Sequence, residues 1–300
     1  MVRSRGSRTG FGLQPRPLLA LKLLLPLLVI TASASAQTPP SIMAQPQLIN
    51  GKLQPTPLPG GLTRAALDRF ATTAGTAWLG YAVPAEKGVG CWHESWSQGQ
   101  RVVSQEGPRV VALEGSSTAH VLYRLDSGRI DRIRVSGGDC TLDTGGLVLH
   151  WSNDVTPAAS VALLATFLTG DVPNRQIDGA LTALAMHRET SALDRLLATA
   201  RVGATTHLRG QALFWLGQRA GDRAVGAINE AIEQDPETEV KRRAVFALSQ
   251  LPKDEGVPLL IQVARTNTNP AVRKQAMFWL GQSKDARAIA FFETILFPRK

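Results

Sequence analysis

Two cysteines and three histidines in the middle of this 300-residue chain have the residue types of a zinc site. They are Cys91, His93, His120, Cys140 and His150. Their spacings match none of the common zinc-binding patterns. The alternative is a disulfide, which is the default for two cysteines in an exported protein. Because the N-terminus predicts export, we expect a bridge between Cys91 and Cys140 and assign no metal ligand.

A second motif with chemical potential is Asp143-Thr144-Gly145, the tripeptide of aspartic proteases. In those enzymes the aspartate activates water as one of a pair of carboxylates. The sequence has no second copy, and only a short strand separates the tripeptide from the helices that follow. A glycine-assisted turn is therefore the favoured interpretation. Because the sequence also has no Gly-rich phosphate loop and no G-x-S-x-G motif, we assign no catalytic residue and no cofactor.

The first 36 residues have the three parts of a secretory signal peptide. They contain basic residues and no acidic one, an apolar stretch at residues 18–30 and an A-x-A cleavage motif at residues 34–36. The apolar stretch is short and is interrupted by Lys22 and Pro26, which argues against a membrane-spanning helix. We therefore expect cleavage after Ala36, a periplasmic or secreted protein, and no membrane span after cleavage.

The charge of the chain narrows the class of partner. The formal net charge is +9, which by itself suggests nucleic acid or an acidic membrane surface. Five of these charges belong to the predicted signal peptide: Arg3, Arg5, Arg8, Arg16 and Lys22. The rest of the sequence has no dense cluster of lysine and arginine, so we predict that the partner is not nucleic acid.

The exported part of the sequence divides into three segments. Residues 37–61 contain six prolines and few large apolar residues, so we expect a disordered linker. Residues 62–155 contain short β-branched and aromatic runs, which predict a small β-rich domain that includes both cysteines. From Thr156-Pro157, an N-cap followed by the first position of a helix, the pattern is helical up to residue 300.

Within the β-rich segment we expect one helix, at residues 63–74, and five short strands. The strands are expected at residues 77–83, 109–113, 120–125, 129–135 and 147–151. Pro84 should end the first strand, and the turn at residues 126–128 should join the third and fourth strands into a hairpin. Simple alternation places Ile130 on the opposite face from Ile133, which leaves the second arm of the hairpin without a consistent apolar face.

The helical segment repeats every 32 residues. QALFWLGQ at residues 211–218 returns as QAMFWLGQ at residues 275–282, with a related octet halfway between them. The aligned positions are alanines, where two helices approach closely, and leucines that fill the seam between helices. They are Ala180, Ala212, Ala244 and Ala276, with Leu184, Leu216, Leu248 and Leu280. We predict a lone helix at residues 157–169 and four helix pairs, which must stack because one pair cannot bury its own apolar faces.

This repeat resembles a HEAT repeat of the short, bacterial HEAT-like kind. The resemblance rests on NPAVR at residues 269–273, followed by Ala276, Leu280-Gly281, Asp285 and Ala288-Ile289, and on matching residues in the two preceding units. Residues 179–210 match less well, because Gln176 replaces the valine of the motif and no basic residue follows it. The resemblance covers residues 157–300 and implies an α-helical HEAT-like solenoid. Together with the predicted signal peptide and the β-rich segment, it predicts a secreted bacterial α+β multidomain protein in which a small β-rich N-terminal domain precedes this solenoid.

The resemblance is specific for the fold and does not define one activity, because such arrays serve many roles. Short bacterial HEAT-like arrays also occur in bilin lyases. Those proteins are cytoplasmic, so the predicted export and the β-rich domain argue against that role. We therefore predict an extracytoplasmic protein-binding or scaffold protein. The alternative is an enzyme with a metal or carboxylate site in the β-rich domain.

A ladder of basic residues begins successive helices, at Arg209, Lys241 and Arg273. In HEAT-like repeats this residue usually meets an aspartate between the helices. The corresponding residues here are Asp222, Asp254 and Asp285. The resemblance therefore implies a structural role for the ladder, and the alternative is a surface for an acidic partner.

Aromatic residues supply the candidate partner-binding side chains. A ladder of phenylalanines with neighbouring tryptophans recurs along the repeats, and the last helix is apolar on more than one side. The candidates are Phe214, Trp215, Phe246, Phe278, Trp279, Phe291 and Phe297. Core packing explains most of the ladder, and partial exposure would make the rest a binding anchor. We expect another protein as the partner, with self-association through the C-terminal helix as a further candidate.

Overall fold

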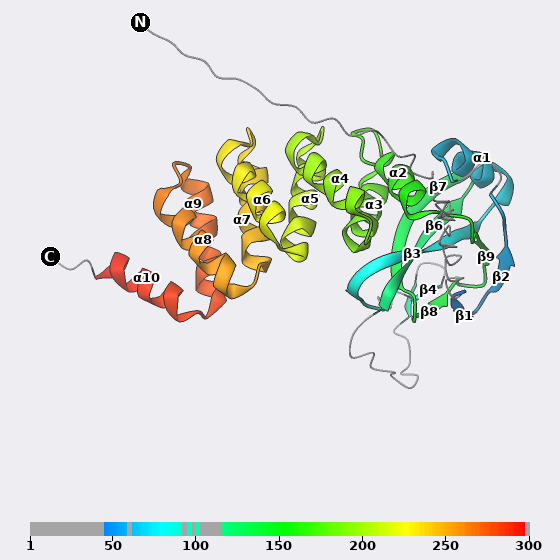
Figure 1. The fold of residues 1–300 in the computed structure, drawn as a ribbon, viewed down its shortest axis with the longest axis horizontal. Helices are drawn as coiled ribbons and strands as arrows, with labels where there is room; N and C mark the ends of the chain where they lie inside the picture. Colours follow the sequence, from blue (N-terminus) through cyan, green and yellow to red (C-terminus); the bar gives the residue numbers. More distant parts are fainter. Residues whose placement is uncertain (1–44, 59–61, 92–94, 98–99, 103–115, 298–300) are drawn as a thin grey trace, which may run out of the picture. The chain divides into compact units, whose positions relative to one another are not determined.

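The computed structural model describes residues 45–58, 62–91, 95–97, 100–102 and 116–297 (Figure 1). The predicted signal peptide, His93 and the expected strand at residues 109–113 lie outside the described residues. The strands occupy residues 47–151, and a run of helices begins at residue 157. This order confirms the predicted fold class, a β-containing part followed by a HEAT-like solenoid.

A five-stranded sheet forms the main part of the β-rich region. In spatial order its strands are β2 (Lys52–Pro55), β9 (Val148–Trp151), β3 (Ala77–Val89), β6 (Ser116–Asp126) and β7 (Arg129–Gly137). β6 runs antiparallel to both β3 and β7, whereas β9 is parallel to both β2 and β3. Two short pairs lie outside this sheet. They are β1 (Gln47–Ile49) with β8 (Thr141–Asp143), and β4 (Ser95–Ser97) with β5 (Gln100–Val102).

The segment predicted as a disordered linker contributes two of these strands, β1 and β2. Leu53 of β2 packs against buried Leu149 and Trp151 on the sheet face opposite the main core. Proline is tolerated because β2 is an edge strand and Pro55 is its last residue. Thr56 N then donates a hydrogen bond to Trp151 O at 2.8 Å. The prediction of a disordered linker is therefore wrong for residues 47–55.

The predicted hairpin is present as β6 and β7, joined by a tight turn. Ser127 and Gly128 have φ angles of 50° and 75°. These left-handed conformations belong to a type I′ turn, whose twist matches that of the flanking strands. Val121, Tyr123 and Leu125 are fully buried along one face of β6, as their alternation predicts.

A β-bulge resolves the mismatch at Ile130. Leu125 pairs with Ile130, whereas the next pair joins Arg124 to Arg132. Asp131 is therefore an extra residue in the second arm. The bulge turns Ile130 toward the main core, together with the other apolar residues of β7.

The helices over residues 157–296 consist of one lone helix and four pairs, as the repeat predicts. α2 (Pro157–Ala165) comes first. The pairs are α3 (Asn174–Met186) with α4 (Thr190–Val202), α5 (Thr206–Arg219) with α6 (Asp222–Gln234), α7 (Thr238–Gln250) with α8 (Lys253–Thr266), and α9 (Pro270–Ser283) with α10 (Ala286–Leu296) (Figure 1). The predicted helix at residues 63–74 is α1 (Arg64–Ala74), which is capped by Thr63 and lies between β2 and β3 in the sequence. No helix in the described part of the chain is long and apolar enough to cross a membrane.

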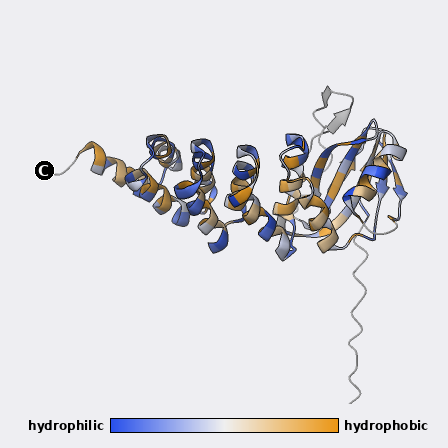
Figure 2. Ribbon diagram, turned by 90° about the horizontal axis from the view of Figure 1, so that it is seen from above, coloured by the Kyte–Doolittle hydropathy of each residue, from blue (hydrophilic) through white to orange (hydrophobic). Residues whose placement is uncertain are grey.

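One apolar core runs from the sheet into the helix pairs. The aligned alanines and leucines of the repeat are at most 1 % exposed, which confirms them as stacking positions. Where the core passes from sheet to helices it contains a polar cluster, in which Tyr81 Oη lies 3.1 Å from Tyr123 Oη and 2.9 Å from Ser160 Oγ of α2. In Figure 2 hydrophobic and hydrophilic stretches alternate along the helices, as expected for helices with one buried face.

The first helix pair is fitted to the sheet. Gln176 Nε2 donates to Ile130 O at 2.5 Å, and the next residue, Ile177, is buried. At Gly179, α3 approaches β7 so closely that a Cβ atom would lie 2.2 Å from Ile133 O. These contacts explain why this unit departs from the repeat motif, because its first helix packs on a sheet instead of on another helix pair.

The first strand does not end at Pro84, contrary to the prediction. β3 pairs with β6 as far as Pro84, and its register then shifts before Val89. Proline is compatible with this position because the ladder becomes irregular there. Pro84 O accepts a hydrogen bond from Arg188 N at 3.0 Å, and Ala85 bridges to His187. The added length of β3 therefore connects the sheet to the loop between α3 and α4.

Candidate functional site

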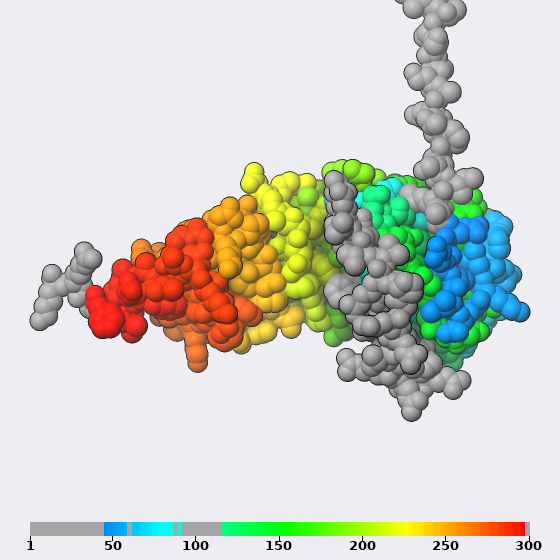
Figure 3. Space-filling view, turned by 90° about the horizontal axis from the view of Figure 1, so that it is seen from below, coloured from blue at the N-terminus to red at the C-terminus, as the bar shows by residue number. Residues whose placement is uncertain are grey.

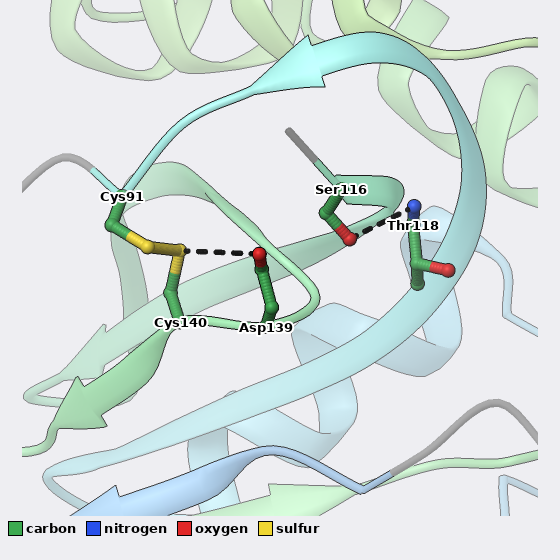
Figure 4. The surroundings of a disulfide bond; sticks show 5 residues. All are labelled: Cys91, Ser116, Thr118, Asp139 and Cys140. Carbon is green, nitrogen blue, oxygen red and sulfur yellow. Dashed lines mark hydrogen bonds between the residues drawn. A yellow bond between two sulfur atoms is a disulfide. The ribbon is translucent and has the colours of Figure 1, made fainter. Parts of the chain in front are cut away.

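The predicted disulfide between Cys91 and Cys140 is present (Figure 4). It joins the end of β3 to the loop between β7 and β8. Asp139 Oδ1 lies 3.9 Å from Cys140 Sγ, and these two residues and Cys91 form a group of potential metal ligands among the described residues. Sulfur atoms that are bonded to each other offer no thiolate to a metal, so the bridge removes the thiolate form of the zinc hypothesis.

The histidines of that hypothesis have separate structural surroundings. His120 is buried edge-on against Trp151, with ring centroids 5.2 Å apart, and neither ring nitrogen has a hydrogen-bond partner among the described residues. Burial lowers the pKa of His120 to about 4, an effect that the Asp139 carboxylate partly opposes. His150 Nδ1 lies 3.0 Å from Thr56 Oγ1. Neither histidine belongs to the group formed by Asp139 and the cysteines.

Asp143 stabilises a turn, as the favoured interpretation of its tripeptide predicts. Its Oδ1 accepts a hydrogen bond from Gly145 N at 2.9 Å, and its Oδ2 accepts one from Asn50 Nδ2 at 3.2 Å. Thr144 Oγ1 donates to the backbone carbonyls of Asn50 and Leu147. These contacts connect the β1–β2 turn to the turn that precedes β9, and they give Asp143 a structural role.

The basic ladder is structural, but its predicted aspartate partners are wrong. Arg209 forms a bidentate salt bridge with Asp235, with distances of 2.7 Å for Nε–Oδ2 and 3.1 Å for Nη2–Oδ1. This carboxylate raises the pKa of Arg209 above its usual value. Lys241 and Arg273 instead donate to backbone carbonyls, those of Glu233 and of residues 267–268.

Sequence spacing did not reveal these partners because they lie at or beyond the C-terminal ends of helices. Asp235 follows α6 and Glu233 is in its last turn, while the carbonyl groups of residues 267 and 268 follow α8. Asp285, which was expected to meet Arg273, pairs with Arg287 at 2.8 Å. Lys241 and Arg273 therefore join the start of one helix pair to the end of the preceding pair, whereas Arg209 joins the start of α5 to the end of its own pair.

The aromatic ladder is a continuous, partly exposed strip on the first helices of three successive pairs. We define the aromatic strip as Phe214, Trp215, Phe246, Phe278 and Trp279. Phe214 stacks on Phe246 with centroids 5.9 Å apart and an interplanar angle of 10°. Phe246 contacts Trp279 at 4.9 Å. Phe278, at the end of the strip, is 53 % exposed.

A pocket of about 350 Å³ lies beside this strip, between α7 and α9. It is lined by Arg242, Ala271, Lys274, Gln275 and Phe278. The helices of the strip also carry a hydrogen-bonded pair of side-chain amides near their C-terminal ends. Gln218 Nε2 of α5 donates to Gln250 Oε1 of α7 at 3.2 Å. These polar residues were not among the predicted binding residues. The signal was present as glutamine at positions 218, 250 and 282, each 32 residues apart.

A second pocket, of about 420 Å³, lies among α1, the hairpin turn and the loop before α3. Part of its charged lining is already paired. Arg64 forms a salt bridge with Asp68 at 3.1 Å and lies 4.2 Å over the ring of Phe167. We place the candidate site on the aromatic strip, because the exposed ring of Phe278 and the cations of Arg242 and Lys274 line the pocket beside it.

The apolar residues of α10 and its C-cap differ in their exposure to solvent. Phe291 is buried beneath Arg265, whose guanidinium lies 5.2 Å from the ring centre, so Phe291 is not available to a partner. Ile289, Leu296 and Phe297 are more than half exposed. Figure 3 shows α10, in red, at the surface of the last helix pair. Self-association through α10 stays a prediction, which sedimentation of the chain over a range of concentrations would measure.

Comparison with known proteins identifies the repeats. The sequence model of the HEAT-repeat family matches residues 226–296, which include the last two helix pairs. A HEAT-like repeat region is therefore present. No curated protein matches the chain.

Two solved structures show partial similarity. One is human deoxyhypusine hydroxylase in complex with glycerol, at 20 % identity over 41 % of this chain, with a TM-score of 0.34. The match spans 43 % of that enzyme, less than half of its length. The other is the complex of CpcE and CpcF of phycocyanin lyase from Nostoc sp. PCC7120, at 19 % identity over 47 % of this chain and 91 % of that one, with a TM-score of 0.36. At these TM-scores we base no conclusion on either similarity.

Proposed function

We propose that this chain is an extracytoplasmic protein-binding protein whose partner docks on the aromatic strip of α5, α7 and α9. The observation that carries the proposal is the continuous contact of the five rings combined with their partial exposure. Aromatic side chains that stay partly exposed can bury apolar area against a partner, and such residues dominate the binding energy of interfaces. A strip needed only for stacking would be covered by the neighbouring repeat.

The contrast with the aligned stacking positions supports this proposal. Ala276 and Leu280 on α9 are at most 1 % exposed, so the repeat already supplies a closed core without the strip. Phe278 adds an exposed ring to the same helix. The location outside the cytoplasm is supported by the signal-peptide pattern and by the disulfide, which persists in oxidising compartments.

Site-specific photo-crosslinking tests the proposed face. A photoreactive phenylalanine analogue at position 278 should yield a discrete crosslinked species in cells that export the chain. The same analogue at Val202, which is 80 % exposed on α4, is the matched control. A Phe246→Ala change should abolish the crosslink from position 278, because it removes the centre of the strip. Equal crosslinking from positions 278 and 202 would contradict the proposal, and the mass of the exported chain would test cleavage after Ala36.

The alternative, an enzyme of the β-rich domain, has less support among the described residues. Asp143 is committed to a turn, and the cysteines are bonded to each other. Within the described ranges, His120 has no hydrogen-bonded partner that could orient it for proton transfer. A binding role for the helical part accounts for more of the observed geometry.

A further inference from the structure

The charge of the two sets of helices differs, and this difference indicates the chemistry of the partner. The first helices α5, α7 and α9 carry seven basic residues and one acidic residue. The second helices α6, α8 and α10 carry four basic and six acidic residues. The aromatic strip therefore lies on the basic side of the repeats.

Most of the cations on the first helices already have partners. Arg209 is paired with Asp235, and Lys241 and Arg273 donate to carbonyl groups. Arg219 Nη2 lies 2.9 Å from Glu86 Oε1.

The remaining cations lie near the pocket. Arg242 and Arg243 share the single carboxylate of Glu239, at 3.2 and 3.4 Å. Lys274 forms no hydrogen bond or ion pair with any residue that the structure describes. The wall of the pocket between α7 and α9 therefore carries a positive charge that no described residue neutralises.

The free cation and the exposed ring lie next to each other. Lys274 and Phe278 are four residues apart on α9, so their side chains share one face of the helix. Arg242 approaches the same hollow from α7 and lies 3.3 Å from Gln275 Oε1. A ligand that fills this pocket would therefore contact an apolar wall and two cationic groups at once.

We infer that the partner binds through an acidic segment that carries a large apolar side chain, with a carboxylate between Lys274 and Arg242 and the apolar group against Phe278. This inference rests on the proposed function and specifies the partner class of the same face. The charge of the face matches such a segment, because a carboxylate would neutralise Lys274 and supplement the single acidic residue, Glu239.

The distribution of cations favours a peptide over nucleic acid. Nucleic-acid binding draws its affinity from several lysines and arginines that neutralise successive phosphates along a groove. Among the lysines and arginines of α5, α7 and α9, Lys274 has no partner among the described residues and lies at this pocket, whereas the others are held by carboxylates or carbonyl groups. A short acidic segment fits this arrangement better than a long phosphate backbone.

Selection from a displayed random peptide library on the full chain tests the inference without assuming a sequence. Selected peptides should be enriched in aspartate or glutamate next to leucine, phenylalanine or tryptophan. Their affinity, measured by fluorescence anisotropy, should fall about tenfold or more for Lys274→Glu. It should recover when the glutamate of the peptide is replaced by lysine.

Lys253→Glu is the matched control, because Lys253 is an exposed lysine on α8, away from the strip. It should leave the affinity within about twofold, as expected for a distant surface charge. Selected peptides without acidic enrichment, or with unchanged affinity for Lys274→Glu, would overturn the inference. Tighter binding of a single-stranded oligonucleotide at the same pocket would overturn it as well.

The Phe246→Ala variant distinguishes this inference from the proposed function. Peptides that lack acidic residues but lose affinity for Phe246→Ala would leave the aromatic strip as the binding face and refute only its acidic preference. Peptides whose affinity is indifferent to both Phe246→Ala and Lys274→Glu would refute the proposed function as well.

Discussion

The first and last helix pairs share one 32-residue pattern but have opposite surroundings. On α3 the pattern is modified at three positions that face the sheet, Gln176, Ile177 and Gly179. The corresponding residues on α9 are Val272, Arg273 and Gln275. The position of Phe278 is occupied on α3 by Thr182, and that of Lys274 by Asp178.

This difference shows which part of the repeat is independent of context. The stacking alanines and leucines are the same in both pairs and equally buried. The outward positions vary with what they contact, so a glycine lies where a strand approaches and an aromatic ring lies where the helix surface is open. Departures from the repeat therefore indicate where a pair contacts something other than another pair.

The largest effect is expected from breaking the largely buried Arg209–Asp235 salt bridge, which joins the start of α5 to the end of α6 and has no counterpart in the described residues of the first or the last helix pair. Asp235→Ala would leave the Arg209 guanidinium partly buried without its carboxylate, and it would remove the acceptor for Glu237 N. We expect a loss of about 3–5 kcal/mol in the free energy of unfolding. Denaturant unfolding would measure it.

Glu230→Ala is the control for Asp235→Ala. It removes the carboxylate of the solvent-exposed Arg201–Glu230 pair, whose N–O distance of 2.8 Å is almost the same. An exposed pair contributes about 1 kcal/mol or less, so the change should be small. Equal losses in the free energy of unfolding for the two variants would show that burial does not make the Arg209–Asp235 pair more stabilising than a surface pair.

Mild acid should destabilise the sheet and the first helix pair before it destabilises the last helix pair. Burial lowers the pKa of His120 and of His187 to about 4, and Arg219 lowers that of His187 further. The unfolded chain takes up these protons near pH 6.5, so the stability contributed by the neutral histidines is complete above pH 6.5 and is lost as the pH falls toward 4. By pH 5 the loss is on the order of 2 kcal/mol per histidine.

Urea unfolding at pH 7 and pH 5 would measure this dependence, and His120→Leu should reduce it. Hydrogen exchange at pH 5 should increase first in β6 and in the loop between α3 and α4, where the two histidines lie. Faster exchange in α9 and α10 alone would contradict the assignment of the acid sensitivity to the sheet and the first helix pair.

A pair of glycine substitutions should change stability in opposite directions. Gly179→Ala places a Cβ atom 2.2 Å from Ile133 O, so α3 or β7 must move, and we expect a loss of about 2 kcal/mol. Gly281→Ala on α9 meets nothing within 4 Å and should stabilise the protein by about 0.5–1 kcal/mol, the usual helix preference for alanine. Thermal unfolding of the two variants compares them directly. A stabilising Gly179→Ala would show that the sheet does not confine α3.

Much of the fold was predictable from local pattern. The 32-residue period located the helix pairs because stacking imposes the same apolar spacing on every unit. The disulfide followed from the cysteine count and the predicted export. The Pro-rich segment was misjudged because edge strands tolerate proline, and an edge is a property of the whole sheet.

The candidate site was predictable only in part. The aromatic ladder could be recognised from its spacing, but the burial of Phe291 and the exposure of Phe278 depend on what packs over each ring. The partner of Arg209 could not be found in sequence, because the pattern specifies where a charge begins a helix and not which loop approaches it.

The sequence by itself determined the order of the two parts, the period of the helix pairs and the residues that stack them, because these follow from regular apolar spacing. Only the tertiary structure decided which outward residues remain open. Exposure, ion pairing and the bulge at Asp131 arise when elements distant in sequence meet. The free cation at Lys274 beside the exposed ring of Phe278 belongs to this second group, since neither property can be read from the helix alone.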